Sequence, residues 1–140
     1  MSILIVFGIS GCDEAPVVGN HQSKVALNTS RSQYSLGDTL VFSFSNGLDH
    51  DIMMDVCEDE TIFSFDLWQD YNWKTYLAVN DDCPADRIIL RIVPPLEKFD
   101  ESYPLINLKT SFTGPFRIVL PYVVGDSAAV VYSNSFSIIP

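Results

Sequence analysis

The sequence predicts an all-β protein, an antiparallel sandwich of seven to nine short strands. From Lys24 onward, apolar and polar residues alternate with a period of two, the pattern of strands that keep one face in water. Gly, Pro, Asn and Asp separate these runs at short intervals. No segment has the periodicity of an amphipathic helix. A small closed barrel is the alternative architecture.

Four segments make up the first part of the predicted sandwich. KVALNTS and SQYSLG form a first strand with a break near Thr29–Arg31. DTLVFSFSNG alternates cleanly, and DIMMDVC is a shorter strand. Met53 and Met54 are adjacent in this last strand and must face opposite ways, so one of them is expected in the core.

A β-hairpin is predicted next. Its arms, TIFSFDLW and WKTYLAV, are separated by the turn-like residues Gln69–Asn72. Alternation predicts which side chains share a face: Phe63, Phe65 and Leu67 on the first arm, and Trp73, Thr75, Leu77 and Val79 on the second.

The remaining strands alternate less regularly. YPLINLK begins with a proline and suits an edge strand, and Pro121 within GPFRIVLPYVV indicates an edge or a bulge because proline has no N–H to donate. RIILRIV, which stops at Pro94-Pro95, is expected to expose Arg87 and Arg91. The side chains expected inside are Ile88, Leu90 and Ile92, then Phe116, Ile118, Leu120 and Tyr122, then Val130, Tyr132, Phe136 and Ile138.

The N-terminus has the features of an export signal. Ile3–Ile9 is a short apolar run, and Ile9-Ser10-Gly11-Cys12 resembles the bacterial lipobox, in which an aliphatic residue and two small residues precede cysteine. The resemblance implies cleavage before Cys12, its modification with diacylglycerol, and fatty acylation (palmitate, for example) of the new amine. Only Met1 and Ser2 precede the run, so the basic residue usual in signal peptides is missing, and a buried strand over 3–9 is the alternative.

This interpretation divides the chain into a signal peptide (1–11), a tether (12–22) and a sandwich domain (23–140). The segment DEAPVVGNHQ contains Pro16 and Gly19 and has no sustained periodicity, as expected of a tether. The protein is therefore expected to be exported and held at the bacterial cell envelope, on its periplasmic or surface face, by the lipid on Cys12.

The domain itself resembles bacterial immunoglobulin-like sandwiches. The resemblance rests on YSLGDTLVFSFSNG, GPFRIVLPY and the terminal YSNSFSI, and the proteinase-inhibitor sandwich of bacilli has a comparable layout. These motifs specify a fold and leave the function open. The spacing of Cys57 and Cys83 does not match the disulfide that joins the two sheets of antibody domains.

The composition excludes several classes of protein. A formal net charge of −10 disfavours binding to the phosphate backbone of nucleic acids. Only 19% of residues are charged and 47% are hydrophobic, so the chain is not a disordered acidic tail. No apolar run approaches the roughly 20 residues of a membrane-spanning helix.

Cys57 and Cys83 flank the predicted hairpin and are expected to form a structural disulfide, which is compatible with export. A redox or metal-binding thiol pair is the alternative. Neither cysteine belongs to a C-x-x-C motif or lies among the basic residues that lower the pKa of a thiol.

The stretch NGLDHDIMMDVCEDE is the richest in polar residues. Its carboxylates are interpreted as solvated loops, with a weak Ca²⁺ site as the alternative, and copper bound by His50 and the methionines as a remote one. The spacing matches no EF-hand loop, and His21 is the only other histidine. No metal site, cofactor or catalytic residue is predicted, because the common hydrolase, zinc-protease and phosphate-loop motifs are missing.

Three aromatic residues near the hairpin turn, Trp68, Tyr71 and Trp73, are the candidate partner-binding residues. Aromatic loops at the end of a sandwich can bind peptides or sugars; the alternative is that Trp73 fills the core and Trp68 covers the sheet edge. Two functions remain open: an envelope binding or scaffolding module for a protein or glycan, and a proteinase inhibitor that acts through a protruding loop. An enzyme ranks third.

Overall fold

The computed structural model describes residues 24–140. The predicted signal peptide and tether, and with them Cys12, lie outside the described residues. Within residues 24–140 the chain forms twelve strands and two short 3-10 helices. None of the helices in this part of the chain is long and apolar enough to cross a bilayer.

The strands follow the predicted segments closely, with a few additions. The elements are β1 (Val25–Thr29), β2 (Gln33–Ser35), β3 (Thr39–Asn46), β4 (Ile52–Cys57), β5 (Glu60–Thr61), β6 (Phe63–Gln69), β7 (Asn72–Val79), η1 (Ala85–Arg87), β8 (Ile88–Val93), β9 (Lys98–Pro104), η2 (Leu105–Leu108), β10 (Phe116–Val124), β11 (Ser127–Tyr132) and β12 (Ser137–Ile139). Twelve strands exceed the predicted seven to nine because short pieces such as β2 and β5 are separate elements.

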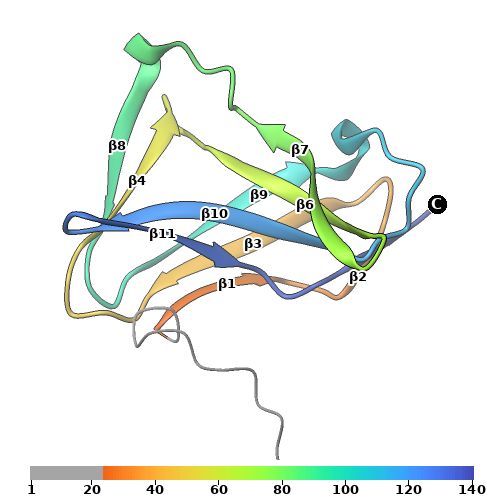
Figure 1. The fold of residues 1–140 in the computed structure, drawn as a ribbon, viewed down its shortest axis with the longest axis horizontal. Helices are drawn as coiled ribbons and strands as arrows, with labels where there is room; N and C mark the ends of the chain where they lie inside the picture. Colours follow the sequence, from red (N-terminus) through yellow and green to blue (C-terminus); the bar gives the residue numbers. More distant parts are fainter. Residues whose placement is uncertain (1–23) are drawn as a thin grey trace, which may run out of the picture.

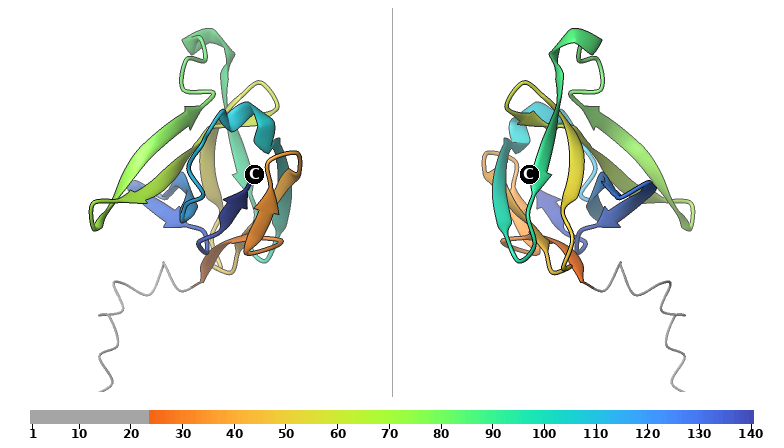
Figure 2. Two further views of the ribbon diagram at one scale, coloured as in Figure 1. Left: turned by 90° about the vertical axis from the view of Figure 1, so that its right-hand side faces the viewer. Right: turned by 90° about the vertical axis from the view of Figure 1, so that its left-hand side faces the viewer.

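Two sheets face each other across the core (Figures 1 and 2). The smaller sheet has the order β1-β3-β9. The larger has the order β5-β4-β10-β6-β7, with β8 paired to β4 and β11 paired to β10. These pairings are antiparallel, and a short parallel pair joins the last strand, β12, to the second strand, β2. The predicted all-β, antiparallel architecture is confirmed.

The core is built from the predicted inward faces of β3, β6 and β10. Leu40, Phe42 and Phe44 of β3 are fully buried, as is Phe65 of β6. On β10, the alternate residues from Phe116 to Tyr122 are buried as predicted. Further buried side chains, Met54 among them, complete the core, so the expectation that one of the two adjacent methionines is internal is confirmed.

The predicted orientation of β8 is wrong. Ile88, Leu90 and Ile92 are exposed, whereas Val93 is buried and Arg91 reaches Glu101 of β9. The face of β8 that carries Arg91 and Val93 therefore lies toward the smaller sheet, although Ile89 at its start stays half-exposed, and the even-numbered residues face outward. Alternation identified the two faces of this strand correctly, but it could not tell which of them the other sheet covers.

Two aromatic residues also differ from their predicted positions. A register shift between Phe65 and Asp66 puts Trp73 opposite Trp68 on the outer face of the hairpin, so Trp73 and Leu77 do not share a face. Tyr132, predicted to point inward, is half-exposed because Val131 takes the inward position on β11.

Two predictions that depended on proline need correction. YPLINLK is the end of β9 followed by the 3-10 helix η2, whose Leu105 and Leu108 are buried. Pro121 lies in a central strand, not at an edge. On one side, β10 pairs with β6 as far as Val119 and then with β4 only at Val123. Pro121 lies between these two pairings and has no partner strand on that side, so no backbone N–H is needed there.

Cys57 and Cys83 form a disulfide with a Cα–Cα distance of 5.8 Å, which confirms the predicted pairing. The bond closes a loop across a sequence separation of 26 residues that contains the whole β6–β7 hairpin. In the chain-entropy model, closing a loop of this size stabilises the folded state by about 3.5 kcal/mol. The bond also fixes the loop between β7 and β8 to the end of β4.

We expect opposite effects from removing two buried tyrosine hydroxyls. The Tyr34 hydroxyl accepts a hydrogen bond from the backbone N–H of Arg31 at 2.9 Å, whereas the Tyr122 hydroxyl is buried without a protein partner, and its burial raises the pKa of Tyr122. Tyr34→Phe should lower the free energy of unfolding by about 1 kcal/mol, and Tyr122→Phe should leave it unchanged or raise it slightly. Urea unfolding measures both, and equal losses would contradict the assignment.

Candidate functional site

The β6–β7 hairpin presents the predicted aromatic residues at the surface. Its turn consists of Asp70 and Tyr71, both with positive φ (51° and 60°), as in the two-residue turns that match the twist of a hairpin. Lys74 donates to the Asp70 carboxylate at 2.9 Å. Tyr71 is 95% exposed at the tip and Trp68 is 40% exposed beside it.

Trp68 and Trp73 pair across the hairpin on its outer face. Their ring centroids are 5.4 Å apart with an interplanar angle of 67°, an edge-to-face arrangement that aromatic rings favour. Trp73 is half-buried, so it neither fills the core nor projects freely into solvent. Neither of the two predicted alternatives describes it fully: the aromatic pair forms a layer on the surface of the sheet.

Arg117 of β10 extends this layer. Its guanidinium carbon lies 4.4 Å from the ring centroid of Trp73 and 3.9 Å from that of Tyr132 on β11. A guanidinium held between two rings gains cation–π attraction and stacking. We call the row Trp68, Trp73, Arg117 and Tyr132 the aromatic stack.

An ion pair fixes the orientation of Arg117. Asp66, its cross-strand neighbour on β6, is 7% exposed and contacts the guanidinium at 3.0 Å (Nη2) and 3.1 Å (Nε). The sequence contained a signal for this pair that the predicted site does not include. FSFDLW and PFRIV each carry one charged residue in an otherwise uncharged and mostly apolar segment, and the two charges are opposite.

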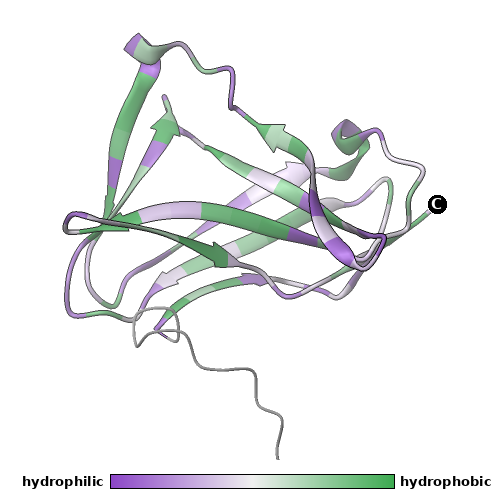
Figure 3. Cartoon of the chain, viewed as in Figure 1, coloured by the Kyte–Doolittle hydropathy of each residue, from purple (hydrophilic) through white to green (hydrophobic). Residues whose placement is uncertain are grey.

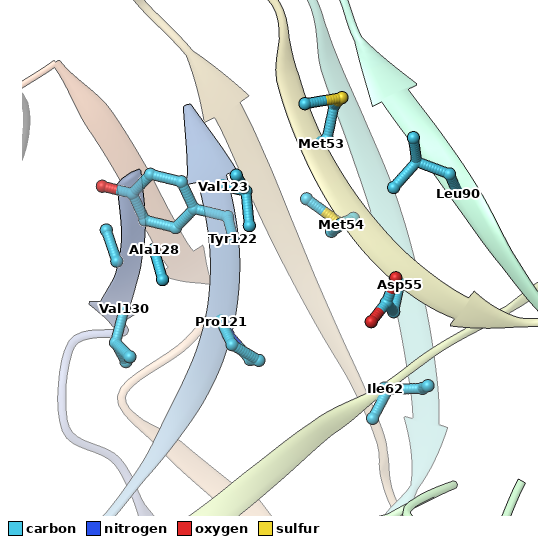
Figure 4. A pocket seen from close by; sticks show the side chains of 11 residues that line it. Met53, Met54, Asp55, Ile62, Leu90, Pro121, Tyr122, Val123, Ala128 and Val130 are labelled. Atoms are coloured by element: carbon cyan, nitrogen blue, oxygen red, sulfur yellow. The ribbon is translucent and has the colours of Figure 1, made fainter. Parts of the chain in front are cut away.

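A slot opens elsewhere on the larger sheet, where β4 and β10 separate (Figure 4). It has a volume of about 370 Å³. Met53 and Leu90 line it on the β4–β8 side, Pro121 and Val123 line it on the β10 side, and Asp55 contributes its carboxylate. A lining of this kind suits a small apolar group better than a polar one.

The acidic stretch before and after β4 is spread over both ends of that strand. His50 lies 3.4 Å from Asp49, and Glu58 lies 3.5 Å from Arg87. Within residues 24–140, no group of three or more His, Cys, Asp or Glu side chains is arranged to hold a metal ion. His21 and Cys12 lie outside the described residues.

Comparisons of the chain with protein-family models, with curated proteins and with solved structures found no match.

We expect Arg117→Ala to lower the free energy of unfolding by about 1–3 kcal/mol, because it leaves the Asp66 carboxylate without a hydrogen-bond partner in a mostly buried position. Lys74→Ala, which removes only the exposed Lys74–Asp70 pair, should change stability little. Urea unfolding followed by tryptophan fluorescence measures stability together with the surroundings of Trp68 and Trp73. Equal effects of the two substitutions would show that the stack does not depend on Arg117.

Proposed function

We propose that this chain is a lipid-anchored binding or scaffolding module of the bacterial cell envelope, built on an immunoglobulin-like sandwich and without catalytic activity. It binds a protein or glycan partner through the aromatic stack and Tyr71. The observation that carries the proposal is the row of aromatic rings around Arg117 at the surface of the β6–β7 hairpin, in which Trp68 and Tyr132 are exposed and Trp73 is half-buried.

The physical basis for binding is preorganisation. Aromatic side chains lose little conformational entropy on binding, and the ring of Trp73 is already held by Trp68 and Arg117. Trp, Tyr and Arg are also the residues that most often dominate binding energy at protein interfaces. Trp68 and Tyr132 still offer exposed ring surface to a partner.

The position of the hairpin turn suits an anchored protein. The start of β1, to which the tether leads, and the β6–β7 turn lie toward opposite ends of the long axis of the domain (Figure 1). With the lipid on Cys12 in a membrane and residues 12–22 as a tether, the hairpin can point away from the bilayer. The lipobox-like sequence Ile9-Ser10-Gly11-Cys12 and the disulfide both support export.

The inhibitor function stays the second candidate because of one feature. The loop from Asn80 to Arg87 projects from the body of the domain and is fixed to β4 by the Cys57–Cys83 disulfide (Figures 1 and 2). A projecting loop restrained in this way has the form needed to enter a protease cleft.

The anchor is tested by the mass of the N-terminal peptide from protein isolated from its host's membranes. We expect a fragment that begins at Cys12 and carries diacylglycerol, and we expect Cys12→Ser to release the protein from the membrane fraction. An unmodified fragment that retains Met1 would contradict the anchor and the exported location.

The binding surface is tested by photo-crosslinking in living cells, with a photoreactive amino acid at Tyr71, at Asp82 in the projecting loop, or at Asp126 in the remote β10–β11 turn. We expect adducts from Tyr71 that disappear when Trp68→Ala is added, and none from Asp126. Adducts of a protease from Asp82 alone would favour the inhibitor function instead. Equal labelling at all three positions would contradict both.

A further inference from the structure

Strand β8 forms an unprotected edge of the larger sheet. Within the described part of the chain it pairs with β4 and with no other strand. The Glu58 N–H donates to the Arg87 carbonyl, so these two residues form a hydrogen-bonded pair of the antiparallel ladder. Hydrogen-bonded and non-hydrogen-bonded pairs alternate along such a ladder, and the register puts Leu90 and Ile92 in non-hydrogen-bonded pairs. Their backbone N–H and C=O groups therefore point away from β4. These groups are free to pair with another strand.

The side chains of this edge are unusually apolar. Ile88, Ile89, Leu90 and Ile92 are each 39–55% exposed, and they lie on both faces of the strand. Figure 3 shows β8 as a mostly apolar strand at the margin of the molecule. Edge strands are commonly protected by lysine, proline or a bulge, and β8 has none of these along Ile88–Val93.

The two arginines near this edge are already paired, whereas Lys98, next to Glu97, belongs to none of the ion pairs found in residues 24–140. Arg91 contacts Glu101 at 3.0 Å and lies over the ring of Phe99, so it is directed toward β9 and is compensated there. Arg87 contacts Glu58. Neither guanidinium is therefore positioned to repel a basic group that approaches the edge.

Acidic residues surround both ends of β8. At its start, the disulfide brings residues 58–60 and 81–82 together, and Asp86 precedes the strand; the carboxylates are Glu58, Asp59, Glu60, Asp81, Asp82 and Asp86. At its end, Asp51 precedes β4 and Glu97 follows Leu96, so two carboxylates lie beside the single ammonium group of Lys98. A partner segment that crosses this edge meets negative potential at both of its ends.

We propose that β8 binds an extended segment of another protein by strand addition, and that this segment is apolar at alternate positions and carries Lys or Arg at its ends. Main-chain hydrogen bonds to Leu90 and Ile92 give the affinity, and contacts with Ile88, Leu90 and Ile92 select apolar side chains. This site is separate from the aromatic stack and does not depend on it.

A second copy of this chain fits the edge less well. In an antiparallel β8–β8 pair related by a two-fold axis, the acidic residues at the start of one strand meet the acidic residues at the end of the other. Like charges that face each other across an interface weaken it and disfavour that partner. A basic segment replaces this repulsion with attraction.

The test uses the full chain and a fluorescent synthetic peptide, Lys-Lys-Val-Thr-Ile-Thr-Val-Lys-Lys, with blocked ends. Fluorescence anisotropy measures its affinity. We expect Leu90→Lys and, independently, Ile92→Lys to weaken binding at least about tenfold, because each puts a charge in the contact. Ile106→Lys, at an exposed position on η2, is the matched control and should bind as the unaltered chain does. Circular dichroism verifies that each variant is folded.

Two altered peptides separate the hydrogen bonds from the charges. N-methylation of alternate amides should abolish binding, and glutamate in place of the lysines should weaken it at least about tenfold. Three results would overturn the proposal. They are a lysine peptide that shows no measurable binding, a lysine peptide that binds the Leu90→Lys variant as tightly as the unaltered chain, and an N-methylated peptide that still binds. If the chain instead self-associates and Leu90→Lys abolishes that association, the edge of β8 binds a second copy of the chain.

Discussion

The fold depends on the strict alternation of one central strand. β10 pairs with β6, β4 and β11, and its inward residues Phe116, Ile118 and Leu120 are fully buried. Because side chains alternate along a strand, burial of this set directs Arg117, Val119, Pro121 and Val123 to the outer face. The aromatic stack uses the first of these residues, and the slot uses the last two. A shift of one residue in the register of β10 would therefore destroy the core and both surface features together.

The buried face of a strand could be predicted from the sequence where only one of its faces is apolar. The prediction failed where the buried face depends on which element of the fold lies opposite the strand. DTLVFSFSNG and GPFRIVLPYVV sit between two layers, so their apolar face is their inner face. RIILRIV has two apolar faces, and only the position of β9 makes Arg91 the inward residue. Trp73 was assigned to the wrong face because a register shift in the hairpin changes the face of a residue without changing the composition of the strand.

Of the candidate site, Trp68, Tyr71 and Trp73 were predictable as aromatic residues near a turn, whereas Arg117 and Tyr132 join them only through strand pairing.

Charge is distributed over this domain in a way that separates its two proposed contact surfaces. At the aromatic stack the buried charges are paired, Arg117 with Asp66, so the surface offered to a partner is mainly aromatic. Around β8 the two arginines are paired, and the carboxylates near the disulfide outnumber the basic groups. The first surface is thus suited to shape and stacking, and the second to backbone hydrogen bonds reinforced by long-range attraction. The net charge of −10 of the whole chain also favours solubility of a protein with exposed isoleucine and leucine side chains.

The separation of β4 from β10 has a mechanical consequence. The ribbon formed by β4 and β8 joins the rest of its sheet through one residue pair, Met53 with Val123, whereas β10 joins β6 through four. Asn46 supports the base of the ribbon, since its side-chain amide donates to the carbonyls of His50 and Val93. The inward residues Ile52, Met54 and Val56 hold it to the core. Side-chain packing and Asn46, more than a continuous ladder of main-chain hydrogen bonds, therefore attach the ribbon to its sheet. We expect its amide hydrogens to exchange by local opening before those of the β6–β10–β11 region.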